Sequence, residues 1–478
     1  MAAAGDAAPH VLVVPYPARG HMQPLLDLAS LLASRGVRLT VVATPATAHL
    51  LAAHPASVRP LSFPSSSSDH DASGPAPIGA DIHALAAALR APLGDWLLRS
   101  QNNSDGNDDD RVAAVLSDFF CGWTQPLAAA AGVPRLVFAP SGLLATGATH
   151  SLFRRAPGTP VGNASYAVAF PDLPGSPAFP WRQISRMYRS YAEGHGGEGA
   201  DAIRDNFLWN LESAGFVCNT CHPLEGAYLD ARPLVDLAGK RVWAVGPVEG
   251  STGNDDEPKD DDVTAWLDAF PDASVAYVSF GTMMVPPPPH AAALAAALDR
   301  AGTPFVWAAS TATLPDGFED RAAEAGAGLV IRGWAPQAAA LRHRAVGCFV
   351  THCGWNSVLE SAAAGVPVLA WPMAADQFFN ARIVVEEARV GVAASWAGFG
   401  AVPDVEHLAR SLTEVVVGEA GAGVRERAKA LAAGVAEAAS EGGSSRRELD
   451  GLVQVLRELA GRRRNRCDHK SFVSVQGH

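Results

Sequence analysis

The alternation of short apolar runs with amphipathic runs is the feature of this chain that most restricts its fold. Residues 10–16, HVLVVPY, form an apolar run typical of a buried strand, and residues 22–36, MQPLLDLASLLASRG, have the apolar spacing of a helix that ends at Gly36. Residues 37–43, VRLTVVA, predict a second strand. A strand, a helix and a strand in this order form a βαβ unit, which implies parallel strands and a right-handed crossover.

The same alternation returns in the second half of the chain after a polar break. The break, GPVEGSTGNDDEPKDDD at residues 246–262, has the composition of a linker. Apolar runs before and after it predict more strands, among them RVAAVLSD, SVAYVSF, VGCFVT and VPVLAWP. Because 478 residues exceed what one core usually supports, we expect an α/β protein of two doubly wound domains, with a ligand site in the cleft between them.

Charge, apolar runs and cysteines exclude several classes of protein. The formal net charge of −12 argues against a broad nucleic-acid-binding surface. No apolar run approaches the ~20 residues of a membrane span, and the N-terminus lacks the basic start of a signal peptide. Six cysteines without a second C-x-x-C pair indicate reduced thiols, so we expect a cytoplasmic enzyme. Neither G-x-G-x-x-G nor G-x-x-x-x-G-K-[ST] follows a predicted strand, which argues against a dinucleotide oxidoreductase and a P-loop phosphotransferase.

Residues 351–360, THCGWNSVLE, join a predicted strand to a predicted helix. The start of a helix presents unpaired N–H groups and a positive dipole end, so an anion is the natural ligand of such a turn. Ser357 and Glu360 also fit the S-x-x-E pattern of a capping box, which needs no ligand. These ten residues alone leave both interpretations open.

Several chemically useful residues follow other predicted strands. His21 follows the first strand and Asp118 ends a later one, so both should lie at the carboxyl edge of one sheet. A histidine oriented there by a carboxylate can act as a general base, although an N-capping histidine and an unrelated aspartate are an equal alternative. In the second half, Trp334 can stack on a planar base, Gln337 can bind a sugar hydroxyl, and the pair at 376–377 can hold vicinal hydroxyls or form a turn.

The spacing of these residues carries a resemblance. From Trp334 to Gln377 the chain reads WAPQAAALRHRAVGCFVTHCGWNSVLESAAAGVPVLAWPMAADQ, which resembles the signature box of the plant UDP-dependent glycosyltransferases of family 1. GHMQP, SDFF, VWAVGP, VSFGT and GGSSRRELDGLV elsewhere in the chain fit the same family.

The resemblance implies the GT-B fold, with two Rossmann-like domains facing a central cleft. The expected division is an acceptor-binding domain (1–248), an acidic linker (249–262), a UDP-sugar-binding domain (263–442), a C-terminal helix packed back on the N-terminal domain (443–460) and a tail (461–478) for which disorder is one alternative.

The resemblance also assigns roles to individual residues. It implies His21 as general base with Asp118 as its partner. Trp334 would stack on uracil while the Ala335 backbone pairs with it, and Gln337 and Glu360 would hold the ribose. The remaining donor contacts would be the diphosphate ligands His352, Gly354, Asn356, Ser357 and Thr282, and the sugar-facing residues Trp355, Asp376 and Gln377.

The implied reaction is an inverting transfer of glucose from UDP-glucose to an acceptor hydroxyl, giving a β-O-glucoside without a cofactor or metal. In related enzymes a glutamine at the end of the box, here Gln377, tends to accompany glucose. UDP-rhamnose, UDP-galactose and a non-phenolic acceptor stay open as alternatives, as do an inactive sugar-nucleotide sensor and an NAD-dependent oxidoreductase. We expect a monomer whose acceptor is a small hydrophobic phenol.

The acceptor pocket is the part of the site that the resemblance defines least. Aromatic residues beside the base suit a flat phenolic ring, such as that of a flavonoid. The candidates for this pocket are Phe119, Phe120, Trp123 and Ser141, although such aromatics are also common in cores.

Overall fold

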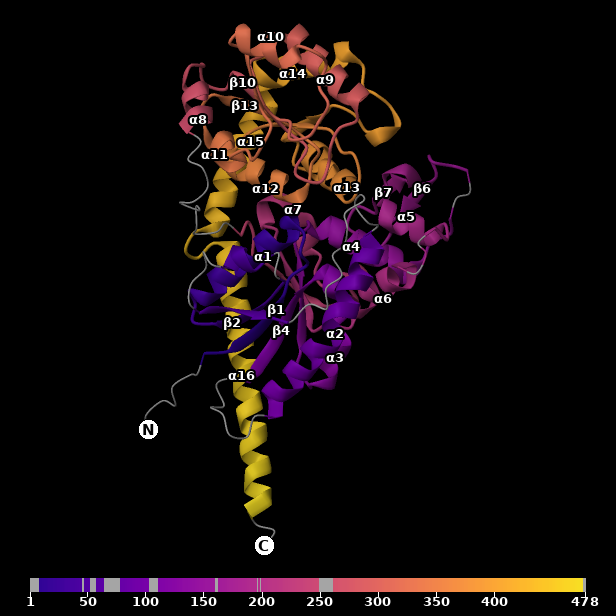
Figure 1. Cartoon of the computed structure of the whole chain (residues 1–478), viewed down its shortest axis with the longest axis vertical. Helices are drawn as coiled ribbons and strands as arrows, with labels where there is room; N and C mark the ends of the chain where they lie inside the picture. Colours follow the sequence, from indigo (N-terminus) through magenta and orange to yellow (C-terminus); the bar gives the residue numbers. More distant parts are fainter. Residues whose placement is uncertain are drawn as a thin grey trace.

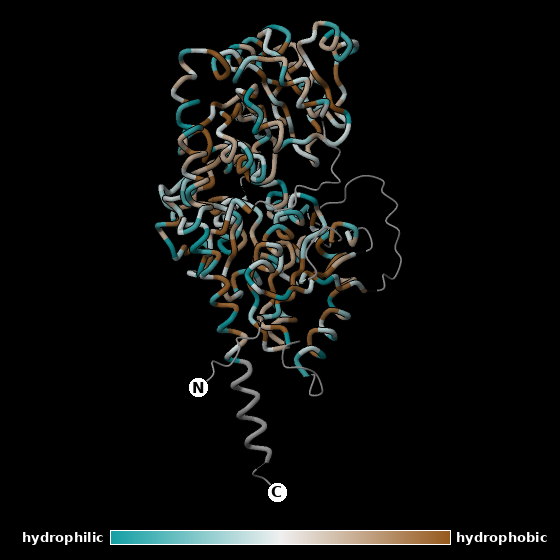
Figure 2. Tube along the Cα trace, turned by 90° about the vertical axis from the view of Figure 1, so that its left-hand side faces the viewer, coloured by the Kyte–Doolittle hydropathy of each residue, from teal (hydrophilic) through white to brown (hydrophobic). Residues whose placement is uncertain are grey.

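A computed structural model of the chain describes residues 8–44, 47–51, 57–63, 78–102, 111–159, 162–195, 197, 199–248 and 261–475, with the backbone alone at 261 and from 463 onward. Two lobes lie one above the other (Figure 1). Figure 2 shows brown, apolar segments in the interior of the lower lobe. Each lobe is built on its own parallel sheet, which confirms the expected pair of doubly wound α/β domains.

The N-terminal domain is built on a parallel sheet in the order β3-β2-β1-β4-β5-β8-β9. Strand order reverses direction at β1, as in other doubly wound sheets. The strands are β1 (His10–Val14), β2 (Arg38–Ala43), β3 (Val58–Ser62), β4 (Val112–Asp118), β5 (Arg135–Ala139), β8 (Gly215–Cys218) and β9 (Arg241–Ala244). The helices are α1 (Arg19–Ala33), α2 (Ile78–Asn102), α3 (Thr124–Ala130), α4 (Leu143–Arg155), α5 (Arg186–Ala192), α6 (Gly199–Leu211) and α7 (His222–Asp230).

The described residues between 154 and 199, a region with no clear sequence period, form short elements. The antiparallel pair β6 (Ala167–Ala169) and β7 (Ala178–Pro180) precedes the short helix η4 (Trp181–Gln183) and α5. Other short helical turns of this domain are η1 (Ala48–Leu51), η3 (Phe119–Cys121) and η5 (Val235–Leu237).

The C-terminal domain repeats the architecture with a parallel sheet in the order β12-β11-β10-β13-β14-β15. Its strands are β10 (Val275–Ser279), β11 (Phe305–Ala308), β12 (Gly328–Ile331), β13 (Val346–Thr351), β14 (Val368–Ala370) and β15 (Gly391–Ala393). Its helices are α8 (Asp261–Asp268), α9 (Pro288–Ala301), α10 (Phe318–Glu324), α11 (Gln337–Arg342), α12 (Trp355–Ala364), α13 (Gln377–Arg382), α14 (Val405–Val416) and α15 (Ala422–Ala439), with a π-turn η6 (Ile383–Glu387) after α13 and a short turn η7 (Gly398–Gly400).

The last helix, α16 (Ser444–Val475), returns to the N-terminal domain, where it runs along the lower lobe (Figure 1) and contacts strands β4 and β9. It extends to Val475, beyond residue 460, where the helix was predicted to end. Its apolar face joins the core of strands β1 and β2 and helix α1 through Leu449, Leu452, Val453 and Leu456. Two ion pairs hold its polar side. Arg35 pairs with Asp450 at 3.0 Å, and Arg232 pairs with Glu448 at 2.8 Å.

The expected acidic linker and the domain interface are described differently by the structure. Most of the expected acidic linker, residues 249–260, lies outside the described residues, and its last two residues begin α8. The domain interface itself is apolar, because residues of α12 and α13 belong to the same buried cluster as α4 and α7.

The packing of α16 predicts a large effect of a single truncation. Leu452 is fully buried between α16 and the N-terminal sheet. We expect Leu452→Ala to lower the free energy of unfolding by roughly 2–5 kcal/mol, because it removes buried apolar area and leaves a cavity. Urea unfolding followed by near-UV circular dichroism measures this. Glu458→Ala, on the exposed side of the same helix, is the control and should cost less than about 0.5 kcal/mol.

Candidate active site

The first pair of candidate residues, His21 and Asp118, is brought together by adjacent parallel strands. β1 pairs with β4, so the first turn of α1 lies beside the end of β4. The Nδ1 atom of His21 lies 3.2 and 3.1 Å from the two carboxylate oxygens of Asp118. Asp118 is fully buried and also accepts from the backbone N–H of Phe120 at 2.8 Å, while the His21 side chain keeps 21% of its surface exposed. The carboxylate therefore fixes the ring, and the ring stays accessible.

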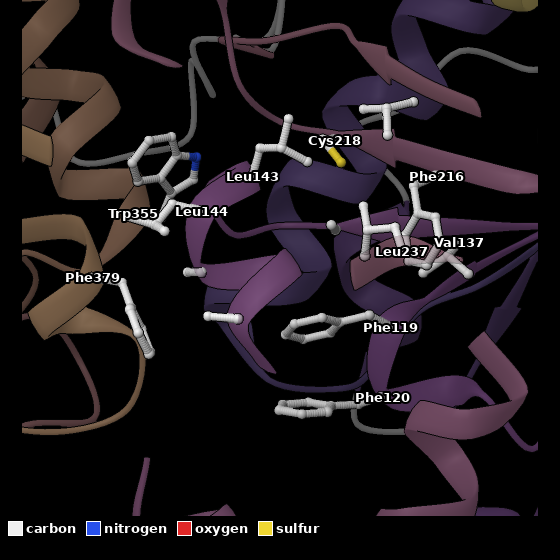
Figure 3. Packing of buried hydrophobic residues seen from close by; sticks show 14 of the residues in the cluster. Phe119, Phe120, Val137, Leu143, Leu144, Phe216, Cys218, Leu237, Trp355 and Phe379 are labelled. Carbon is white, nitrogen blue, oxygen red and sulfur yellow. The ribbon is translucent and has the colours of Figure 1, made fainter. Parts of the chain in front are cut away.

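Three aromatic rings surround the His21 imidazole. Phe120 stacks on it with ring centroids 4.9 Å apart, and Phe119 and Tyr16 lie at 5.4 Å. Figure 3 shows the Phe119 and Phe120 rings one above the other beside α4. Trp123, by contrast, lies in the core with 1% of its surface exposed, so it does not line a pocket as expected. It begins the turn into α3, and its ring points into the apolar cluster instead.

The turn between β13 and α12 holds His352 between two glycines. A Cβ atom on Gly281 would lie 2.9 Å from the imidazole, and one on Gly354 would lie 2.5 Å from it. Gly281 also has a φ of +74°, which disfavours any side chain. Thr282 follows Gly281 and is exposed.

The capping-box interpretation of the turn is wrong. Gly354 is the N-cap of α12, and no side chain caps this helix start. Ser357 is therefore the third helical residue, and it and Glu360 accept hydrogen bonds from the Gln337 amide, at 3.2 Å for Ser357. The first N–H groups of α12 thus have no side-chain cap, as an anion site requires.

Burial keeps His352 neutral. The imidazole is 9% exposed, and this desolvation lowers its pKa to about 4. At neutral pH the ring can donate or accept one hydrogen bond at each nitrogen, but it contributes no charge.

The loop after β12 and the loop after β14 carry the other predicted contacts. Trp334 is 42% exposed, and the Arg19 guanidinium lies over its ring at 3.5 Å from the centroid. Ala335 is partly buried beside it, and its carbonyl accepts from the Gln337 N–H at 2.8 Å.

Asp376 and Gln377 begin α13 but differ in their surroundings. Asp376 accepts hydrogen bonds from Ser141 of the opposite domain and from Asn380 at 3.1 Å. The Gln377 side chain is buried, and its carbonyl oxygen accepts from two backbone N–H groups of its own loop, at Met373 and Ala374, both at 2.9 Å. The aspartate therefore faces the opposite domain, and the glutamine fixes the loop with its oxygen while its NH₂ group remains a donor.

Two hydrogen bonds across the domain interface hold the start of α12 against the N-terminal domain. The Trp355 indole N–H donates to the Asn219 carbonyl at 2.6 Å, and the Asn356 amide donates to the Gly20 carbonyl at 3.1 Å. The Trp355 side chain is buried against α4 (Figure 3), so it faces the domain interface and not the cleft. Gly20 adjoins His21, which places the histidine next to the start of α12.

Sequence reasoning missed Asn219 and Asn380. Asn219 also accepts from the Val248 N–H at 2.9 Å, and Asn380 donates to the Cys353 carbonyl at 3.0 Å. Both are nearly fully buried amides in apolar runs, and this combination is the signal that could have identified them.

Within the part of the chain that the structure describes, His, Cys, Asp and Glu side chains nowhere gather in threes around a possible metal position. None of its helices combines the length and the apolar character of a membrane span.

Comparison with known proteins gives one consistent family. Residues 244–416 match the model of the UDP-glucoronosyl and UDP-glucosyl transferase family. Flavonol 3-O-glucosyltransferase UGT89B1 of Arabidopsis thaliana is 40% identical over 93% of this chain and 95% of its own length.

Solved structures agree in fold. Phytolacca americana UGT2, complexed with UDP-2fluoro-glucose and pterostilbene, has a TM-score of 0.80 and 26% identity over 94% of this chain and 99% of its own. Arabidopsis thaliana UGT89C1, complexed with UDP-L-rhamnose, has a TM-score of 0.72 and 34% identity over 94% and 99%.

The low pKa of His352 makes stability depend on pH. In the unfolded chain the imidazole takes up a proton below its ordinary pKa of 6.5, whereas in the folded protein it does so only near 4. Unfolding is therefore favoured as the pH falls from 6.5 towards 4. We expect the free energy of unfolding to fall by about 1 kcal/mol between pH 7 and pH 5.5 because of His352.

Denaturant titrations of the wild type and of His352→Gln at both pH values measure this effect. The loss of stability on acidification should be smaller in the variant by that amount. An identical loss in both proteins would show that folding does not change the pKa of His352.

Proposed function

The chain belongs to the plant UDP-glycosyltransferases of family 1, which have the GT-B fold and transfer a glycosyl group from a UDP-sugar to a small acceptor, and from that premise we propose that it transfers glucose from UDP-glucose to a phenolic hydroxyl with inversion. The observation that carries the proposal is the contact between Asn356 and Gly20. It supports a single reaction centre, because it joins the start of α12 to the residue before His21.

We propose His21 as the general base. Its Nδ1–H donates to the Asp118 carboxylate, so the lone pair of Nε2 is available for a proton. The carboxylate also stabilises the imidazolium that forms. His21 takes the proton of the acceptor hydroxyl, the oxygen forms a bond to the anomeric carbon, and the bond from that carbon to the diphosphate breaks with its electron pair on UDP. One displacement converts an α-linked donor into a β-glycoside.

The leaving group is stabilised by the start of α12. Its uncapped N–H groups and dipole favour an anion by ~0.3–2 kcal/mol, and Asn356, Ser357 and His352 add hydrogen-bond donors. Thr282 completes the set proposed for the diphosphate. We propose on this basis that the enzyme needs no divalent cation and no cofactor. A cytoplasmic location and a monomeric state stay predictions.

The proposed sugar is glucose. The relative UGT89B1 is a flavonol 3-O-glucosyltransferase, and Gln377 ends the box as in many glucose-using relatives. Ser141 and Asp376 meet across the cleft, so a sugar in this position would contact both domains.

The proposed acceptor is a flat phenol. Phe120 stacks on the His21 ring and Phe119 lies tilted beside it, so an aromatic acceptor would be held by these rings with its hydroxyl near the base. A phenol has a pKa near ~10, so His21 needs less driving force to remove its proton than from an alkyl alcohol.

The role of His21 predicts a separation of turnover from donor binding. His21→Ala should lower kcat by roughly 10²–10⁴-fold, because the proton acceptor is lost, while UDP affinity stays within about twofold. Asp118→Asn should lower kcat less, because it misorients the base without removing it. Steady-state rates and calorimetric titration with UDP measure both quantities. Near-normal turnover in His21→Ala would exclude this base.

Substrate preference is tested by a matrix of donors and acceptors with mass-spectrometric product detection. Equimolar UDP-glucose, UDP-galactose and UDP-rhamnose compete as donors. The acceptors are a flavonol, a simple phenol, a terpenoid alcohol and a carboxylic acid, and each reaction is run in EDTA and in Mg²⁺. We expect glucosylated flavonol to dominate in both buffers. A tenfold preference for another sugar would contradict glucose as the donor sugar, and one for a non-phenolic acceptor would contradict the phenol. Activity lost in EDTA and restored by Mg²⁺ would contradict the proposal that no divalent cation is needed.

A further inference from the structure

Arg19 spans the two domains at the mouth of the donor site. It is the first residue of α1 in the N-terminal domain, yet its guanidinium lies 3.5 Å from the centroid of Trp334 in the C-terminal domain. Its neighbour Gly20 accepts the hydrogen bond from Asn356 at the start of α12. Arg19 therefore lies between the residue proposed to stack on uracil and the helix end proposed to bind the diphosphate.

The groups proposed for the diphosphate supply no full positive charge. Thr282, Asn356 and Ser357 are uncharged, and His352 is neutral at pH 7 because burial lowers its pKa to about 4. The dipole of α12 adds the equivalent of roughly half a charge. UDP, in contrast, carries a strongly anionic diphosphate that must also be stabilised when it leaves.

An arginine suits this position better than other cations. Its guanidinium is planar and delocalised, so it can lie on an indole face and can also bind phosphate oxygens with two parallel hydrogen bonds. The side chain is long and its residue is exposed, so rotation about its bonds moves the guanidinium from the indole towards the start of α12 without any change in the core.

We propose that Arg19 is a donor-binding residue supplied by the acceptor domain, and that its guanidinium pairs with the diphosphate of the UDP-sugar. This inference rests on the proposed function and adds a positively charged residue to the proposed donor site. An arginine from one domain that binds a ligand of the other also favours the closed arrangement of the domains whenever the donor is bound.

The rival role is stacking alone, with Arg19 acting only on the Trp334 ring and the uracil beside it. The two roles differ in which part of UDP they need. Pairing with the diphosphate acts on UDP and not on uridine, whereas stacking acts on both equally.

The test is calorimetric titration of the full-length protein with uridine, UMP and UDP. The variants are Arg19→Ala, Arg19→Gln and Arg19→Lys, where Gln keeps a planar group without charge and Lys keeps the charge without the fork. The matched control is Arg90→Ala, because the Arg90 guanidinium also lies over an indole, that of Trp209, 5.6 Å from its centroid and between α2 and α6.

We expect Arg19→Ala and Arg19→Gln to weaken UDP binding by about 10- to 100-fold, the size of a charge-assisted pair, while uridine affinity changes by less than about twofold. Arg19→Lys should recover part of the UDP affinity, and Arg90→Ala should bind all three ligands like the wild type. The Michaelis constant for the UDP-sugar should rise in parallel.

Two results would overturn the inference. Equal losses for uridine and UDP would assign Arg19 to the base, and an unchanged UDP affinity in Arg19→Ala would remove it from the site. A wild-type protein that fails to bind UDP would instead overturn the proposed function itself, and this inference with it.

Discussion

The hydrogen bond from the Trp355 indole to the Asn219 carbonyl fixes how the two halves of the active site face each other. It lies in the apolar interface, where an unpaired indole N–H would cost about 1–3 kcal/mol. Trp355 begins α12 and Asn219 follows β8, so this bond sets the start of α12 against the N-terminal domain, whose helix α1 carries His21. The contacts between Asn356 and Gly20 and between Ser141 and Asp376 form at the spacing that it imposes.

Much of this arrangement could be predicted from the sequence, because parallel strands gather functional residues at one sheet edge. His21 and Asp118 were predicted to share such an edge, but the sequence does not reveal that β1 and β4 are direct neighbours, which is what puts the two side chains in contact. Trp123 was predicted to line the acceptor pocket, but an aromatic residue in a turn after a strand can lie either in a pocket or in the core, and the sequence does not distinguish the two. The S-x-x-E pattern at Ser357 failed because the helix starts three residues earlier than a capping box requires.

The residues proposed to bind the donor comprise buried, neutral groups and an exposed, charged one. His352 lies between Gly281 and Gly354, where it would contribute direction and hydrogen bonds without a charge. A permanent cation at that depth would be costly to desolvate whenever no anion is bound. Arg19 lies at the rim, where water solvates its charge and the Trp334 ring covers one face of the guanidinium.

The return of α16 to the N-terminal domain has a consequence for biosynthesis. Leu449, Leu452, Val453 and Leu456 belong to the apolar cluster of the N-terminal sheet and α1, yet in the chain they follow the whole C-terminal sheet. The C-terminal domain draws its own buried clusters from residues 263–416 and does not wait for α16. During translation the nascent N-terminal domain therefore carries an uncovered apolar face that chaperones can recognise. The domain that is synthesised first is completed by a helix that is synthesised after the second domain.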